Sequence, residues 1–300
     1  MRVAYHDPMK KQKPGSPTDR NPTVVRWQLS RELKRLRGDR SATEVAKAMR
    51  MTTSIVFRWE TAGSDGVVPA PGTLSRLLDY YEVSDEEAHR LMELRQEART
   101  RGWWQPYDLD KHYGTLIGLE ASAMEIEAYD PQLVPGLLQT EDYMRAVIKA
   151  TRPDAPPEVV EQRVEVRIHR QKAWERGATE LWIIMGEAAL RQMIGGPPVM
   201  DEQLARLLDL SDHPRVTLQA VLFSEGGHAG LETSGFRVLR LSEIDLTAVY
   251  VEGRTSNLYL DSDEDVEVYE KVFNNLRATA SGAQTTRSLI ADIRRGIQRG

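Results

Sequence analysis

Cysteine is absent from all 300 residues of the chain. This absence excludes disulfides, thiol nucleophiles and thiolate metal ligands together, and it is typical of a protein from a reducing compartment. Long hydrophobic runs are also missing, because no apolar stretch approaches the roughly 20 residues of a membrane-spanning helix. Residues 1–20 carry charges and prolines with no apolar segment behind them, which does not fit a secretory signal. We therefore expect a cytoplasmic protein without a membrane partner.

Residue patterns of catalytic and metal sites are also missing from the sequence. The six histidines are scattered and form no H-x-H or H-x-x-x-H pair, and no G-x-S-x-G sequence surrounds a serine. The acidic run at 261–265 lacks the spaced ligands and central glycine of a calcium loop, and it precedes an expected helix that acids would stabilise. We therefore expect no catalytic residue, no cofactor and no metal, and the chain is not expected to be an enzyme.

Charge is distributed unevenly along the chain. Residues 1–60 contain 14 Lys/Arg against 6 Asp/Glu, a net charge of +8, whereas the other 240 residues contain 26 against 39, a net charge of −13. A basic segment can neutralise nucleic-acid phosphates while an acidic body keeps the protein soluble. Taken alone, the asymmetry fits a basic tail without a target equally well.

Five short helices are predicted in the N-terminal third. Leucines recur at helical spacing in the first, Ser41 and Glu44 form a capping box for the second, and Thr52 is a suitable N-cap for the third. The predicted helices cover residues 23–37, 41–49, 52–60, 73–81 and 84–99. Together they form a helix-turn-helix domain over residues 23–99, behind a flexible basic arm at 1–22.

The pattern changes in residues 100–300, which we interpret as an α+β regulatory or partner-binding domain. Trp103 and Trp104 lie at the junction and are candidates for connecting the two domains. Two helices are predicted over 113–150, with further helices at 156–174, 187–193, 201–210, 261–280 and 284–299. Strands are predicted at 179–185, 216–223, 236–241, 248–252 and 257–260. The expected fold is mainly α with an α+β C-terminal part, in which the sheet is mostly antiparallel.

The most informative segment is 41–60, where two short helices flank a tight turn. Ala46 provides the small side chain needed where two helices cross at a steep angle. The second helix directs short polar groups and an arginine outward, which suits base edges in the major groove, and its N-terminus favours phosphate. Thr53 and Arg58 are the strongest candidates for base contacts. The predicted DNA-binding set is Thr52, Thr53, Ser54 and Arg58, with Arg40, Lys47 and Arg50 on phosphates.

This segment resembles the helix-turn-helix of lambda-repressor-like (XRE-type) regulators. The resemblance implies a five-helix, lambda-repressor-like DNA-binding domain. Two residues depart from the family pattern. Arg50 stands where the family usually has glycine, so the turn must accept a side chain, with strain if its φ is positive. Ala42 stands where a phosphate-contacting glutamine is common.

The rest of the chain resembles a large family of actinobacterial regulators, which join an XRE-type domain to an uncharacterised, antitoxin-like C-terminal domain. The resemblance rests on Trp103-Trp104, on the segment 131–143 (PQLVPGLLQTEDY), and on Leu181-Trp182 with the segment 187–191. It covers about residues 23–295 and implies a regulator with a small partner protein encoded nearby. Physically, the segment 131–143 fits a sharp connection that fills a core and then caps a helix.

These observations favour a sequence-specific transcription regulator that binds double-stranded DNA as a homodimer. A dimer is expected because one short helix reads few base pairs, and two half-sites about 34 Å apart supply the missing affinity. The C-terminal domain is expected to bind a small partner protein or a ligand.

Two alternatives remain open at this point. In the first, the chain is an antitoxin-like interaction module whose main role is to bind and neutralise a small partner protein. In the second, the sheet over 179–260 encloses a pocket for a small-molecule ligand.

Overall fold

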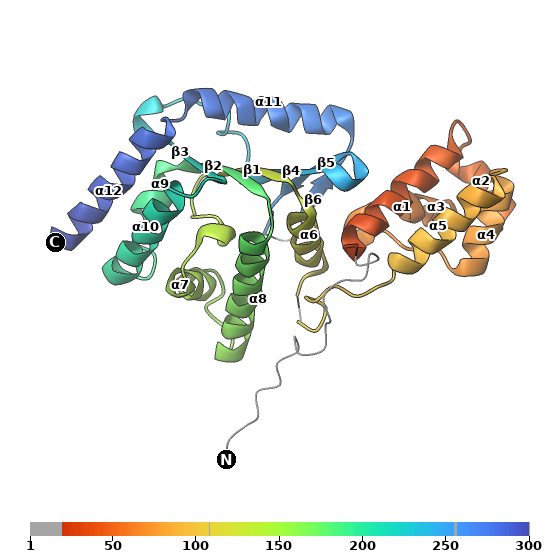
Figure 1. Cartoon of the computed structure of the whole chain (residues 1–300), viewed down its shortest axis with the longest axis horizontal. Helices are drawn as coiled ribbons and strands as arrows, with labels where there is room; N and C mark the ends of the chain where they lie inside the picture. The colour runs from red at the N-terminus through yellow and green to blue at the C-terminus, as the bar shows by residue number, and fades with distance from the viewer. Residues whose placement is uncertain (1–19, 108, 255–256, 300) are drawn as a thin grey trace, which may run out of the picture.

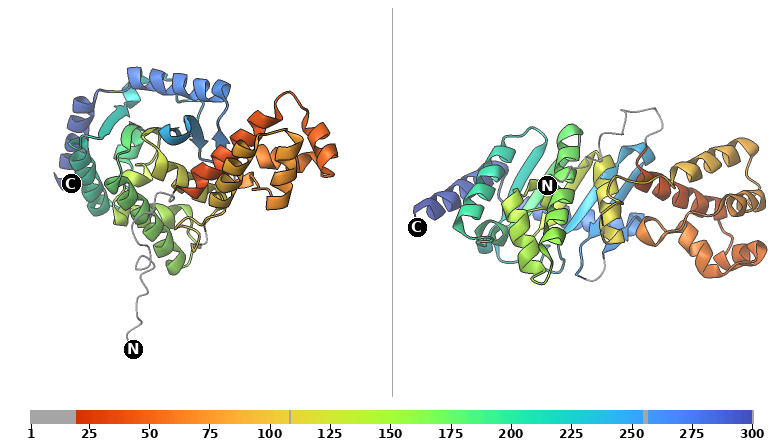
Figure 2. Two further views of the ribbon diagram at one scale, coloured as in Figure 1. Left: turned by 45° about the vertical axis from the view of Figure 1, so that its right-hand side comes forward. Right: turned by 90° about the horizontal axis from the view of Figure 1, so that it is seen from below.

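The computed structural model describes residues 20–107, 109–254 and 257–299 (Figure 1). The arm predicted at 1–22 lies almost entirely outside the described residues. The chain forms a helical bundle followed by a larger part built around one sheet, and Figure 2 shows the bundle at one end of the molecule.

Helices occupy each of the N-terminal segments in which the sequence predicts one. They are α1 (Pro22–Arg37), α2 (Ala42–Met49), α3 (Thr53–Glu60), α4 (Pro71–Tyr80) and α5 (Asp85–Glu97), with a short 3-10 turn, η2 (Gly63–Asp65), after α3. All five helices contribute to one hydrophobic core, which includes Leu29, Leu33, Val45, Val56, Trp59, Leu74, Leu77, Leu91 and Leu94.

Capping side chains determine where the helices of this bundle begin. The Ser41 hydroxyl accepts the Glu44 backbone N–H at 3.2 Å, and the Glu44 carboxylate accepts the Ser41 backbone N–H at 2.8 Å. Two otherwise unsatisfied donors are thereby paired at the start of α2. These hydrogen bonds lower the pKa of the Glu44 carboxyl, which is therefore ionised at neutral pH. Ser84 caps α5 by accepting the Glu87 N–H at 3.3 Å.

The C-terminal part contains a six-stranded mixed sheet. Its strands are β1 (Glu125–Asp130), β2 (Glu180–Gly186), β3 (Val216–Val221), β4 (Phe236–Leu241), β5 (Leu246–Val251) and β6 (Leu258–Leu260), in the spatial order β3-β2-β1-β4-β5-β6. The β1–β2 and β2–β3 pairs are parallel, whereas the β1–β4, β4–β5 and β5–β6 pairs are antiparallel.

Helices cover both faces of this sheet. They are α6 (Lys111–Ser122), α7 (Glu141–Thr151), α8 (Pro157–Arg176), α9 (Glu187–Arg191), α10 (Pro197–Ser211), α11 (Asp263–Thr279) and α12 (Ala283–Arg299). Figure 1 shows α11 along one face and α6, α7 and α8 on the other. Side chains of β1 alternate between the two cores, since Ile126 and Ala128 pack on the α6 side and Tyr129 packs beneath α11. None of the described helices is long and apolar enough to cross a membrane.

The central strand β1 corrects the sequence prediction, which assigned helix to this part of 113–150. Residues 125–130 include Glu and Ala, which favour helix, but they alternate between the two faces and pair with β2 on one side and β4 on the other. Pairing on both edges therefore overrides the local propensity. The sequence predicted five of the six strands, and its expectation of a mostly antiparallel sheet fits only the β1–β4–β5–β6 side of what is a mixed sheet. The parallel pairs β1–β2 and β2–β3 were missed: β1 was predicted as helix, and the helices predicted between strands 179–185 and 216–223 were not interpreted as a parallel crossover.

Helix α1 is shared between the two hydrophobic cores. Its residues Val24 and Trp27 belong to the C-terminal core, whereas Val25 and Leu29 belong to the bundle core. The fully buried Trp27 indole donates a hydrogen bond to Asp261 Oδ2 at 2.8 Å and packs edge-on against the Tyr259 ring at a centroid distance of 5.9 Å. The two parts of the chain are therefore joined through packed side chains of a rigid helix.

The first turn of α1 also contacts α6 at Gly118. The Asn21 side chain donates to the Gly118 carbonyl oxygen at 2.7 Å while its own oxygen caps α1. A Cβ at position 118 would lie 2.2 Å from Thr23 Oγ1, a distance that no packed structure tolerates. Glycine is therefore required there for the two helices to approach.

The tryptophan pair expected at the domain junction packs mainly within the C-terminal part. Trp104 is buried with Ile117 of α6 and Val166 of α8, and Trp103 stacks edge-on against it at 5.8 Å. The hydrogen bonds between α1 and the C-terminal part come instead from Asn21, Trp27 and Arg31.

A buried ionic network lies between α6, α8 and the sheet. Arg170 donates two hydrogen bonds to Glu120, from Nε to Oε2 at 2.8 Å and from Nη2 to Oε1 at 2.9 Å, and both side chains are nearly fully buried. Arg237 of β4 lies 3.9 Å from Glu120 and 3.6 Å from Asp130. Burial raises the pKa of the Asp130 carboxyl, and its Oδ2 has no hydrogen-bond partner among the described residues. Two guanidinium groups thus balance two buried carboxylates.

We predict that Trp27→Ala destabilises the whole protein, because it leaves a cavity in the C-terminal core and removes the contact that joins the two parts. The expected loss is about 3–5 kcal/mol of unfolding free energy, as for other buried aromatic truncations. Asp261→Ala, which only leaves the indole N–H without its acceptor, is expected to cost about 1–3 kcal/mol. Urea denaturation of the full chain measures both. A change below 1 kcal/mol for Trp27→Ala would contradict the shared-helix description.

Candidate nucleic-acid interface

The α2–turn–α3 unit is closed by backbone hydrogen bonds around Ala46. The buried Ala46 carbonyl oxygen accepts the Met51 N–H at 2.9 Å, and Arg50 occupies the left-handed region with φ 55° and ψ 48°. The positive φ that the sequence led us to consider at Arg50 is therefore present. A non-glycine residue in this conformation carries backbone strain of about 1–2 kcal/mol.

The inner face of α3 is fixed by packing and by one ion pair. Val56 and Trp59 are buried in the bundle core. At the end of the helix, Arg37 Nε donates to Glu60 Oε1 at 2.7 Å, and the Glu60 carboxylate is almost completely buried. The orientation of α3 relative to α1 therefore depends on both apolar contacts and this pair.

The outer face of α3 consists of polar, exposed side chains with one exception. Ser54 and Arg58 are exposed, whereas Thr53 is half-buried. The Thr52 hydroxyl lies 3.1 Å from the Ser54 hydroxyl, so these two groups already form a hydrogen bond with each other. The exception is the apolar residue Phe57, which is 54% exposed.

The N-terminus of α3 has no side-chain cap. Thr52 occupies the N-cap position with extended dihedral angles, as the sequence predicts, but its side chain makes no capping hydrogen bond. Backbone N–H groups of the first turn therefore face outward without a side-chain acceptor, at the positive end of the helix dipole. Such a terminus suits a phosphate oxygen.

Three of the four predicted cations are exposed around this helix. Among the described residues, the side chains of Lys47, Arg50 and Arg58 form no hydrogen bond or ion pair with another side chain. Their charges are therefore available to an anionic partner. Cations that are free and exposed beside an uncapped helix N-terminus fit the phosphates of a nucleic acid.

Arg40 differs from the other three cations because its guanidinium group makes contacts within the protein. It is half-buried, lies over the Tyr81 ring at 5.6 Å, and donates a long hydrogen bond of 3.4 Å to the Leu36 carbonyl oxygen. Burial raises the pKa of Tyr81 to about 12, so this ring is uncharged at neutral pH. Arg40 therefore stabilises the end of α1. This structural role could not be predicted from the spacing of residues in the sequence.

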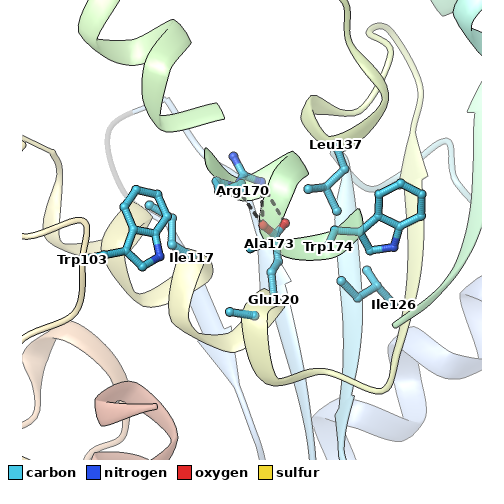
Figure 3. Close-up of a pocket in the computed structure, with 9 residues that line it drawn as sticks. Trp103, Ile117, Glu120, Ile126, Leu137, Arg170, Ala173 and Trp174 are labelled. Atoms are coloured by element: carbon cyan, nitrogen blue, oxygen red, sulfur yellow. Dashed lines mark hydrogen bonds and ion pairs between the residues drawn. The ribbon is translucent and has the colours of Figure 1, made fainter. Parts of the chain in front are cut away.

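Two cavities lie outside the helix-turn-helix. One, of about 10 Å³, is lined by the Glu120–Arg170 pair together with Trp103, Ile117, Leu137 and Trp174 (Figure 3), and it has room for one water molecule. The other, of about 240 Å³, is lined by residues of α1 and α6 together with Trp104, Gln105, Tyr107, Leu109 and Asp110. Neither is lined by residues 179–260, where a ligand pocket was considered. Within the described ranges, no three His, Asp or Glu side chains gather as metal ligands.

Comparison with known proteins divides the chain at the same place as its two cores. Residues 28–91 match the family described as a helix-turn-helix domain, so the N-terminal bundle contains a helix-turn-helix of the kind found in DNA-binding regulators. Neither the curated proteins nor the solved structures gave a match. Residues 113–292 match the family described as a domain of unknown function (DUF5753). Because this match covers more than half of its length, the chain belongs to the DUF5753 family.

Proposed function

We propose that the chain is a sequence-specific transcription regulator that acts in the cytoplasm and docks α3 in the major groove of double-stranded DNA. The outer face of α3 carries the proposal, because it combines exposed hydroxyl groups with exposed cations that have no partner among the described residues. Arg58 is assigned to a base edge, and Lys47 and Arg50 to phosphates. The proposal includes no catalytic step and no cofactor.

The proposal includes a homodimer for reasons of binding energy. Helix α3 has eight residues and presents few side chains to DNA. Two copies on half-sites about 34 Å apart would supply the affinity and the site length that one copy lacks.

For the C-terminal domain we propose a regulatory role, in which it binds a small partner protein encoded nearby or a small-molecule ligand. Its contacts with α1 support this role, because a change at Asp261 or Tyr259 acts directly on the helix that also packs in the bundle core. A small ligand would find room in the 240 Å³ cavity beside α1, where the half-buried Arg26 contributes a positive charge.

An antitoxin-like interaction module remains the alternative, suggested by the family resemblance. The two functions differ in what the purified full-length chain binds alone. Stoichiometric binding of a small protein without DNA, combined with no sequence-selective DNA binding, would favour the alternative.

We predict that Arg58→Ala weakens binding to the protein's own upstream DNA by about 1–3 kcal/mol and relaxes its sequence preference, because a base contact is lost. Fluorescence anisotropy against scrambled DNA at two salt concentrations measures both effects. Arg176→Ala, which removes an exposed arginine at the end of α8, serves as the charge-matched control and should leave affinity unchanged. Weak binding that is equal on both DNAs and disappears with salt would contradict the proposal.

We predict opposite effects of Arg50→Gly on stability and on DNA binding. Glycine relieves the left-handed strain, so the unfolding free energy should rise by up to about 1 kcal/mol. Loss of the charge should weaken binding to all DNA sequences alike and reduce the salt dependence of binding. Urea denaturation and salt-dependent anisotropy measure the two effects. Unchanged affinity and unchanged salt dependence would remove Arg50 from the interface.

A further inference from the structure

Phe57 lies on the face of α3 that points away from the bundle core. With about 100° between successive residues of an α-helix, the direction opposite the buried Val56 and Trp59 is that of Ser54. Phe57 and Arg58 lie roughly 50° to either side of that direction. The outer face of α3 is therefore a hydroxyl flanked by a phenyl ring on one side and a guanidinium on the other.

No aromatic contact covers the Phe57 ring among the described residues, and 54% of the residue is exposed. Its carbonyl oxygen accepts a hydrogen bond from the Thr61 hydroxyl at 2.8 Å, so the backbone at this position is held in place. A partner that covers this ring would remove its apolar surface from water, which favours binding.

The surrounding charges determine which partner fits. Arg58 follows Phe57 on the outer face of α3, Arg50 lies in the turn before α3, and Lys47 lies on α2, which packs against α3. All three are exposed and have no ion-pair partner within the described part of the chain. An apolar protein surface that covered Phe57 would also desolvate these cations without neutralising them, which is costly. A polyanion that carries an apolar group satisfies both requirements. In the major groove of DNA that group is the 5-methyl group of thymine.

We propose that Phe57 determines specificity by packing against a thymine methyl group in each half-site. This inference rests on the proposed function, since it requires α3 to lie in the major groove. The ring adds apolar readout to the hydrogen bonds of Arg58, and it distinguishes thymine from cytosine, which has no methyl group at C5. The DNA-binding set predicted from the sequence does not include Phe57.

The test uses a DNA duplex that the full-length wild-type protein selects from a random-sequence pool. Each thymine is replaced in turn by deoxyuridine, which removes only the methyl group, and affinity is measured by fluorescence anisotropy. At one thymine per half-site, the wild type should lose affinity about fourfold, the value expected for burial of one methyl group. Phe57→Ala should bind the thymine and deoxyuridine duplexes equally, whereas Phe57→Leu should keep part of the preference.

Phe223→Ala is the matched control, because Phe223 is also an exposed phenylalanine but lies in the 3-10 turn η4 (Phe223–Glu225) of the C-terminal domain. It should keep the full thymine preference. If the wild type selects a duplex but no deoxyuridine substitution weakens binding, or if Phe57→Ala keeps the fourfold loss, the thymine contact is refuted while DNA binding stands. If the wild type selects no duplex at all, the proposed function itself fails.

Discussion

The arrangement of the molecule depends on α1, which packs in two hydrophobic cores at once. Its first turns place Val24 and Trp27 among the side chains of the C-terminal core, and its later turns place Leu29 and Leu33 in the bundle core. Since a helix is stiff over this length, the cores cannot move independently without breaking one set of contacts. The hydrogen bond from Trp27 to Asp261 satisfies the only polar atom of the indole in this buried position.

The same helix fixes the proposed DNA-reading surface. At its C-terminal end, Arg37 holds Glu60 at the end of α3, so α1 connects the sheet domain to α3 through packed groups. Regulation of DNA binding by a partner or ligand needs such a physical connection. A displacement of α1 at its contacts with β6 or α6 would therefore also change its contacts in the bundle core and at Glu60 of α3.

Sequence predicted the bundle well because its signals are local. The starts of α2 and α5 are marked by capping residues within three or four positions: Ser41 and Glu44 for α2, and Ser84 for α5. The spacing of apolar side chains indicates which face of each helix packs in the core. The central strand β1 could not be predicted in this way, since its identity depends on pairing with residues 55 to 115 positions away. The same holds for the Glu120–Arg170–Arg237 network, whose members come from three separate elements.

The candidate site shows the same division between local and non-local information. Spacing alone identified the exposed positions of Ser54 and Arg58, whereas the left-handed conformation of Arg50 was considered only because the resembling family has glycine there. Spacing could not show that Arg40 lies over the Tyr81 ring, because that ring lies three helices further along the chain. Nor could spacing predict the exposed fraction of Phe57. This fraction depends on the orientation of α3, which is set by the packing of Val56 and Trp59 in the core.

The central claim is that α3 lies in the major groove in two copies. Hydroxyl-radical footprinting combined with guanine-methylation interference, on a duplex selected by the full-length protein, tests it most directly. The account predicts two protected segments about one helical turn apart, with interference at major-groove guanines in each. Uniform protection along the duplex without interference at any guanine would show that the protein binds DNA only through charge, and would contradict the account.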